Sequence, residues 1–313
     1  MTRDGRILFA NVSAIMGPWS LAARPDEGSV SGEPRKVMED LMPALDFSLS
    51  RDGSKIAFVS YGSLRTARVA VRVKDLKNGR ETSIPTQGEF LNKRPRLSPD
   101  GSVLAYQNTV SDKNRTYLVS GGSTAGREVC ESCPIVCLFS DANYALVAGR
   151  RNELLRLNVG SGERIPVLTV ESGIIFDAGL SPDDRWIGFI VGKPDGRVAL
   201  NAAPLGPAPV SEKDSILVCE DGHYLGSPKW SPNGRFLYYL SERDGCCCLY
   251  AQRLDPVSKR PVGGAIGVYH AHQARFRLNF PPGNGTLGIA SDKIVFQVSN
   301  MTGNIYLAMP KTR

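Results

Sequence analysis

The sequence predicts an all-β fold, a β-propeller of four-stranded antiparallel blades, and three observations support this prediction. A four-residue turn phrase recurs along the chain, a short apolar run follows each copy, and the copies are spaced at about the length of one blade. The clear copies are Ser-Arg-Asp-Gly at residues 50–53, Ser-Pro-Asp-Gly at 98–101, Ser-Pro-Asp-Asp at 181–184 and Ser-Pro-Asn-Gly at 231–234. Weaker copies begin at residues 2, 140 and 291, so successive copies lie 41 to 60 residues apart. Self-similarity at roughly 40–50 residues is typical of propeller blades.

The turn phrase predicts the connection between the first two strands of each blade. Asp-Gly and Asn-Gly fit a tight hairpin because both central positions need positive φ, and the preceding Pro helps to end a strand. The residues before the phrase are therefore the innermost strand. The apolar run after it is the second strand, which is apolar on both faces because neighbouring blades cover it.

A second recurring turn predicts two further strands in each unit. The turns at residues 75–81, 158–164 and 255–259 follow the short alternating segments 70–73, 154–157 and 249–254. Such alternation is typical of a half-exposed strand. We expect these segments to be third strands that lead to an outer fourth strand, which completes a propeller blade. No segment has a helical pattern over three turns.

The repeated Ser-Pro-Asp-Gly phrase with its following apolar-Ala/Gly-aromatic run resembles the TolB/Tricorn-type β-propeller repeat, a relative of the WD repeat. The resemblance covers nearly the whole chain. The closing stretch at residues 303–308 and the Cys-x-x-Cys at 130–133 are similar to bacterial propeller regions attached to sensor kinases or winged-helix regulators. The resemblance implies a binding or sensory role rather than a catalytic one.

The number of blades follows from the number of apolar second-strand runs. Seven such runs favour seven blades, with six as the alternative, and residues 1–313 are expected to form a single propeller domain. The ring should be closed by strands from both ends of the chain, because an open edge strand invites aggregation. The first unit has no inner strand, so we expect the chain to be a fragment that lacks upstream sequence.

Composition limits the class of partner and the compartment. The net charge is +7, with the basic residues spread along the chain, which suits an anionic partner but not a nucleic-acid tract. The chain has no apolar stretch of 18 residues, so no membrane insertion is expected. It has no signal peptide as given. A cytoplasmic location is the default expectation, and a periplasmic one is the alternative if the start is truncated.

The cysteines and histidines give no clear metal or catalytic signature. Cys130 and Cys133 can be free structural thiols, a local disulfide or metal ligands. In the triplet at residues 246–248, strand alternation sends the outer two side chains to one face and Cys247 to the other, which argues against a joint role. His270 and His272 share one strand face, but no carboxylate or Cys stands beside them in the sequence. With no Gly-x-Ser-x-Gly elbow either, we expect no catalytic residues, no metal and no cofactor.

Binding is expected on the face opposite the repeated turns. That face carries the blade-to-blade crossings and the variable loops between second and third strands, and variable loops on a rigid scaffold are where binding residues usually lie. The residues leading into the inner strands should line the mouth of the channel there: Asp46, Arg94, Arg96, Asp177, His223, Tyr224 and Lys229.

The sequence therefore predicts a non-enzymatic binding or scaffold module. We expect a protein or peptide partner, with a small ligand as the alternative and without nucleic acid. The alternative function is a propeller hydrolase or lyase with its active site in the channel, because a fold alone does not decide function.

Overall fold

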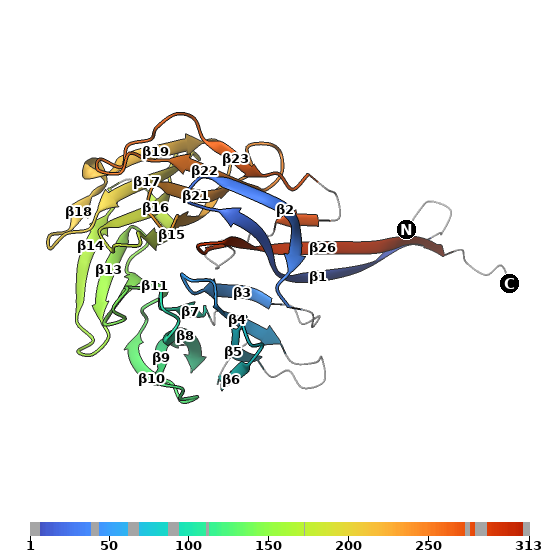
Figure 1. Ribbon diagram of the computed structural model, residues 1–313, viewed down its shortest axis with the longest axis horizontal. Helices are drawn as coiled ribbons and strands as arrows, with labels where there is room; N and C mark the ends of the chain where they lie inside the picture. The colour runs from blue at the N-terminus through green and yellow to red at the C-terminus, as the bar shows by residue number, and fades with distance from the viewer. Residues whose placement is uncertain are drawn as a thin grey trace.

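The computed structural model describes residues 7–38, 44–61, 69–86, 94–110, 113–171, 173–272, 276–278 and 287–308. Their strands form six sheets arranged as a ring (Figure 1). In these ranges there is no α-helix, only a 3-10 turn at Glu212–Asp214. No helix among these residues has the length and apolar character needed to cross a bilayer. The predicted all-β class and the four-stranded antiparallel blade are confirmed.

We number the blades I to VI, and each is given from its innermost strand outward. Blade I contains β3 (Ala44–Leu49), β4 (Lys55–Tyr61), β5 (Val69–Asp75) and β6 (Glu81–Pro85). Blade II contains β7 (Arg96–Leu97), β8 (Val103–Val110), β9 (Lys113–Ser120) and β10 (Arg127–Glu131). Blade III contains β11 (Ile135–Leu138), β12 (Tyr144–Ala148), β13 (Glu153–Asn158) and β14 (Arg164–Thr169), with β18 (Val210–Ser211) added in parallel at its outer edge.

The other three blades complete the ring. Blade IV contains β15 (Ile174–Leu180), β16 (Trp186–Gly192), β17 (Val198–Pro204) and β19 (Ile216–Asp221). Blade V contains β20 (Leu225–Trp230), β21 (Phe236–Ser241), β22 (Cys248–Arg253) and β23 (Ile266–Tyr269). In blade VI, β24 (Phe276–Leu278) and β25 (Leu287–Ile289) both pair with β26 (Lys293–Ala308), which is followed by β1 (Ile7–Arg24) and β2 (Ser29–Lys36).

The expectation of seven blades is wrong, and the alternative of six is correct. The first and last apolar runs belong to one blade, because β1 pairs antiparallel with β26 from Ile7 opposite Ala308 to Ala22 opposite Lys293. The N-terminal segment thus supplies the two outer strands of the blade whose inner strands come from the C-terminal segment. This arrangement closes the ring with strands from both ends of the chain, as expected, and leaves no open edge at the junction.

The repeated turn phrase makes the same hydrogen bonds in every clear copy. In blade II the Ser98 hydroxyl donates to Asp100 Oδ1 at 2.6 Å and accepts the Val103 N–H at 2.9 Å. Asp100 Oδ1 also accepts the Ser102 N–H at 3.0 Å. The phrases in blades I, IV and V repeat this pattern, and the Ser side chains are buried. The phrase is therefore a structural turn, as predicted.

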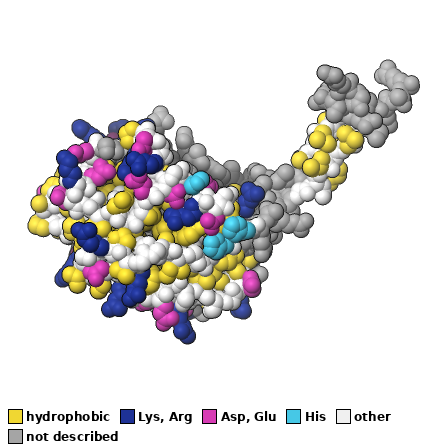
Figure 2. Space-filling model, turned by 90° about the horizontal axis from the view of Figure 1, so that it is seen from above, with side chains coloured by type: hydrophobic (Ala, Val, Ile, Leu, Met, Phe, Trp, Pro, Cys, Tyr) yellow, Lys and Arg dark blue, Asp and Glu magenta, His cyan; other side chains and the backbone are white. Residues whose placement is uncertain are grey.

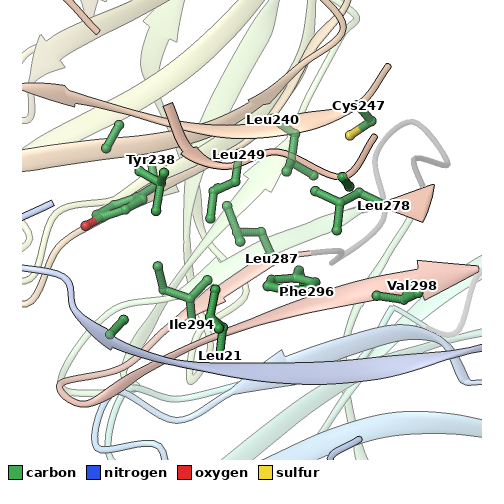
Figure 3. Packing of buried hydrophobic residues seen from close by; sticks show 14 of the residues in the cluster. Leu21, Tyr238, Leu240, Cys247, Leu249, Leu278, Leu287, Ile294, Phe296 and Val298 are labelled. Carbon is green, nitrogen blue, oxygen red and sulfur yellow. The ribbon is translucent and has the colours of Figure 1, made fainter. Parts of the chain in front are cut away.

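Apolar residues on both faces of the second strands hold neighbouring blades together. In β16, Phe189 packs into the cluster shared with blade III, and the adjacent Ile190 packs into the cluster shared with blade V. The largest cluster of described residues lies between blades V and VI, and Tyr238, Leu249 and Phe296 all belong to it (Figure 3). The two-sided apolar pattern of the sequence thus corresponds to two blade interfaces.

The outer halves of β1 and β26 project from the ring as a two-stranded extension (Figure 1). Its described apolar side chains are exposed, among them Leu8 at 64% and Ile305 at 75%, and Figure 2 shows them grouped along it. The rings of Phe9 and Tyr306 stack across the two strands at 5.3 Å between centroids.

Candidate ligand-binding channel

The inner strands of the blades enclose two neighbouring cavities along the channel. The larger, about 160 Å³, lies among the ends of the inner strands and the repeated turns. The smaller, about 60 Å³, lies toward the start of the inner strands. Arg96, Val136 and Lys229 line both cavities, so the two are successive sections of one channel.

Arg96 and Asp46 form a largely buried ion pair in the channel wall. The Arg96 Nη1 lies 3.1 Å from Asp46 Oδ1, and the two side chains are 12% and 8% exposed. Arg96 also donates from Nε to the Val136 carbonyl at 2.8 Å and from Nη1 to the Pro95 carbonyl at 2.8 Å. These bonds join blades I, II and III, so Arg96 holds the wall together as well as lining the cavity.

Arg94 has unmet hydrogen-bonding capacity at the smaller cavity. Its φ of 38° lies in the left-handed region, which costs a non-Gly residue on the order of 1–3 kcal/mol and is often found at functional sites. Burial and the positive charge of Arg96 lower the pKa of Arg94, while Asp46 and Asp177 act in the opposite direction. Its buried Nε has no hydrogen-bond partner among the described residues, and the residue lines the smaller cavity.

Asp177 and Lys229 bring further charge to the channel from blades IV and V. Asp177 accepts the Ala178 N–H at 2.8 Å and, across the blade junction, the Ser227 N–H at 3.1 Å. Burial raises the pKa of Asp177, and the nearby Lys229 and Arg96 oppose this rise. The residues predicted from the sequence thus bring three cationic side chains and two carboxyl groups to the channel wall or next to it.

The last two predicted site residues, Tyr224 and His223, lie outside this charged group. Tyr224 is half-buried near Asp177, and its pKa is raised mainly by burial and then by that carboxylate. His223 is exposed in the turn between β19 and β20, where its N–H donates to Asp221 Oδ1 at 3.1 Å. It lines neither of the two cavities. Of the seven predicted residues, four line the two cavities, Asp46 is paired with Arg96 beside them, and Tyr224 and His223 line neither cavity.

Two charged residues of the repeated turns, Arg51 and Asp184, also line the larger cavity, although binding was expected only on the opposite face. Arg51 Nη2 donates to Ser140 Oγ at 3.2 Å, and Asp184 Oδ2 accepts the Ser140 N–H at 2.8 Å. Both residues belong to turns that directly follow inner strands. Because the ends of the inner strands line the larger cavity, the position of these residues in the turn phrase could have predicted their place there.

The described channel offers little catalytic chemistry. The Cys137 thiol lines the larger cavity, but burial raises its pKa to about 11, so it stays protonated near neutral pH. Neither cavity is lined by a histidine. Away from the channel, Cys130 and Cys133 form a disulfide, one of the three alternatives that the sequence left open.

Comparison with solved structures identifies the fold. TolB from Acinetobacter baumannii has a TM-score of 0.59 at 18% identity, with 76% of this chain covered and only 61% of that chain. A putative TolB from Agrobacterium tumefaciens has a TM-score of 0.64 at 16% identity, with 92% of this chain and 99% of that chain covered. A chain of the nidogen/laminin complex has a TM-score of 0.54 at 12% identity, with 80% and 94% covered. No family model and no curated protein matches the sequence. The chain thus has a β-propeller fold like that of TolB.

Proposed function

We propose that this propeller is a non-enzymatic binding module that takes an acidic segment of a protein or peptide into its channel. The observation that carries the proposal is the excess of cationic side chains at the smaller cavity, which is lined by Arg94, Arg96 and Lys229 and by one acidic residue, Asp177. Burial disfavours the charge of Arg94, and a charge-assisted bond from its guanidinium to a ligand carboxylate would offset part of this cost.

The charge of the channel supports an anionic ligand. Arg94, Arg96 and Lys229 outnumber Asp46 and Asp177, and Asp46 is already paired with Arg96. Charge-assisted bonds between guanidinium and carboxylate are among the stronger hydrogen bonds in proteins. The net charge of +7 would also steer an acidic partner toward the propeller.

A catalytic role for the channel has less support. Asp177 has a raised pKa, a property that catalytic acids share. The channel thiol, however, is held protonated, and no histidine lines the two cavities. The described channel therefore lacks a thiolate–imidazole pair, one of the arrangements that nucleophilic catalysis uses.

An array of acidic and charge-neutral peptides tests the proposal directly. The intact chain should capture acidic peptides, and Arg94→Ala and Lys229→Ala should each weaken capture by roughly 10- to 100-fold, since a hydrogen bond to a charged group is worth about 1.5–3 kcal/mol. Arg150→Ala is the matched control, because Arg150 is an exposed cation in a loop of blade III and lines neither cavity. Equal capture by all three variants would show that the channel is not the binding site.

A further inference from the structure

Blade V brings together side chains of the types that bind transition metals. Asp244, Cys248, His270 and His272 each offer a ligand atom, and these four atoms all lie within 4.8 Å of one another. In a tetrahedral zinc site with bonds of about 2.0–2.3 Å, ligand atoms lie roughly 3.3–3.8 Å apart. The widest pair of ligand atoms, at up to 4.8 Å, therefore needs to approach by about 1.0–1.5 Å at most to reach that geometry.

Strand pairing explains why residues far apart in the sequence meet here. β22 begins at Cys248 and β23 ends at Tyr269, and Leu249 pairs with Tyr269. The start of one strand and the end of the other therefore lie side by side. Asp244 lies in the turn between β21 and β22, which is closed by the Gly245 N–H donating to the Glu242 carbonyl at 2.9 Å.

The alternation of side chains sends the candidate ligands to one side. Cys247 and Ala271 are both buried in the cluster shared with blade VI, where Figure 3 shows Cys247. The residues on either side of Cys247 and Ala271 face away from that cluster. Cys246 Sγ lies 3.5 Å from Cys248 Sγ, and the rings of His270 and His272 stack with their centroids 5.5 Å apart. The alternation expected for the cysteine triplet is correct. It brings thiols and imidazoles together, which corrects the expectation that the histidines have no Cys or carboxylate beside them.

The orientation of each imidazole leaves one nitrogen facing the group. His270 Nδ1 lies 3.1 Å from Asp244 Oδ2, while its Nε2 packs over Gly267, where a Cβ would collide with it. His272 Nε2 lies 3.8 Å from Cys248 Sγ, and its Nδ1 lies 3.5 Å from Cys246 Sγ. The atoms that face one another are thus His270 Nδ1, His272 Nε2, Cys248 Sγ and an Asp244 oxygen.

Neighbouring side chains contact these four residues. In metal sites, groups that contact the ligands in this way fix the orientation of the ligands. The Tyr250 hydroxyl donates to Asp244 Oδ2, and the Tyr250 ring meets His270 edge-on at 5.9 Å between centroids. Cys246 faces the second nitrogen of His272. The nearby Arg243 is itself paired with Asp221 at 3.1 Å, which reduces its repulsion of a cation.

We propose that Asp244, Cys248, His270 and His272 bind one Zn²⁺ ion. A mixed set of one thiolate, two imidazoles and one carboxylate suits zinc, which accepts sulfur, nitrogen and oxygen ligands in tetrahedral geometry. Cys248 is buried, whereas the other three are exposed, so the ion can enter from solvent. Figure 2 shows histidine side chains grouped at the surface of the propeller body. The ion would join the β21–β22 turn to the end of β23, both of which pack against the closing blade.

Zinc titration of the reduced, chelator-treated full chain tests this site, with a competing chromophoric chelator to report affinity. We expect one Zn²⁺ per chain, and His270→Asn and His272→Gln should each weaken binding by roughly 100-fold or more, beyond the 10- to 100-fold typical of outer partners. His223→Gln is the matched control, because it removes the third histidine, which is exposed in a turn of another blade junction. Co²⁺ should give a thiolate-to-metal absorption band that Cys248→Ser abolishes.

The possible outcomes separate the site from its alternatives. Because Cys248 is buried, its replacement can unfold the blade, so the two exposed histidine variants carry the test if Cys248→Ser does not fold. The proposal is overturned if no stoichiometric zinc binds. It is also overturned if His223→Gln weakens binding as much as His270→Asn does, or if zinc fails to raise the melting temperature of the unsubstituted chain.

Discussion

The ion pair between Arg96 and Asp46 should contribute strongly to the stability of the ring. Its two side chains are only 12% and 8% exposed, and breaking a buried pair by removing one partner costs about 3–5 kcal/mol. Arg96→Met also removes the donors that serve the Val136 and Pro95 carbonyls. Because Arg96 lines a cavity that water can enter, we expect a loss at the lower end, about 3 kcal/mol.

Equilibrium unfolding in urea, followed by tryptophan fluorescence, measures this loss. The double-mutant cycle with Asp46→Asn should give a coupling energy of at least about 1 kcal/mol, since contacting residues are not additive. Lys77→Met is the control. Lys77 Nζ lies 3.8 Å from Asp52 Oδ2, and the two side chains are 75% and 56% exposed. Such surface pairs contribute about 0–1 kcal/mol to the free energy of unfolding. The reasoning fails if Arg96→Met unfolds like Lys77→Met, or if the effects of the two channel substitutions simply add.

Three further predictions concern the turns and the ring junction. Ser98→Ala should cost about 2 kcal/mol, because two buried hydrogen bonds are lost, whereas the exposed Ser102→Ala should cost under about 0.5 kcal/mol in the same urea assay. The Ser98 hydroxyl, followed by the Ser102 N–H, lowers the pKa of Asp100 to about 2. Its contribution to stability is therefore present above about pH 4 and lost as the pH falls toward 2, so Asp100→Asn should flatten the acid limb of the stability profile. An unchanged slope there would contradict this assignment. Tyr238→Phe removes the 2.8 Å bond from the hydroxyl to the Pro25 carbonyl and should lower the free energy of unfolding by about 1–2 kcal/mol; a neutral effect would show that this junction bond is not needed.

Local patterns in the sequence predicted the blades, whereas long-range pairing decided their number. The turn phrase and its apolar run are local, so the strands around residues 50–53 and 98–101 fall where they were expected. The runs at the two ends of the chain look like separate second strands. They become neighbours only through the pairing of β1 with β26, and no local pattern encodes that pairing.

The same distinction explains which site residues were found. The channel residues could be predicted because each lies two or four residues before the serine of a recognisable turn. The zinc ligands could not, because Cys248 and His270 are brought together by the register that sets Leu249 opposite Tyr269. Their spacing in the sequence is not that of any zinc motif, and a strand register is set by the folded sheet.

The channel is best understood as two rings of side chains positioned by the repeated turn. Each blade contributes two positions of its inner strand, one four residues and the other two residues before the serine that begins the turn. Because side chains alternate along a strand, both positions face the same side. A register shift interrupts the inner strand beside the first position in blades I, III, IV and V, and such bulges re-aim side chains. Around blades I to V the first ring is Asp46, Arg94, Val136, Asp177 and Ser227, and the second is Ser48, Arg96, Leu138, Gly179 and Lys229. The turn keeps its sequence while these positions vary from blade to blade. Single substitutions at ring positions can therefore change the ligand while the hydrogen bonds of the turns stay the same, although Arg96 and Asp177 also make bonds that join neighbouring blades.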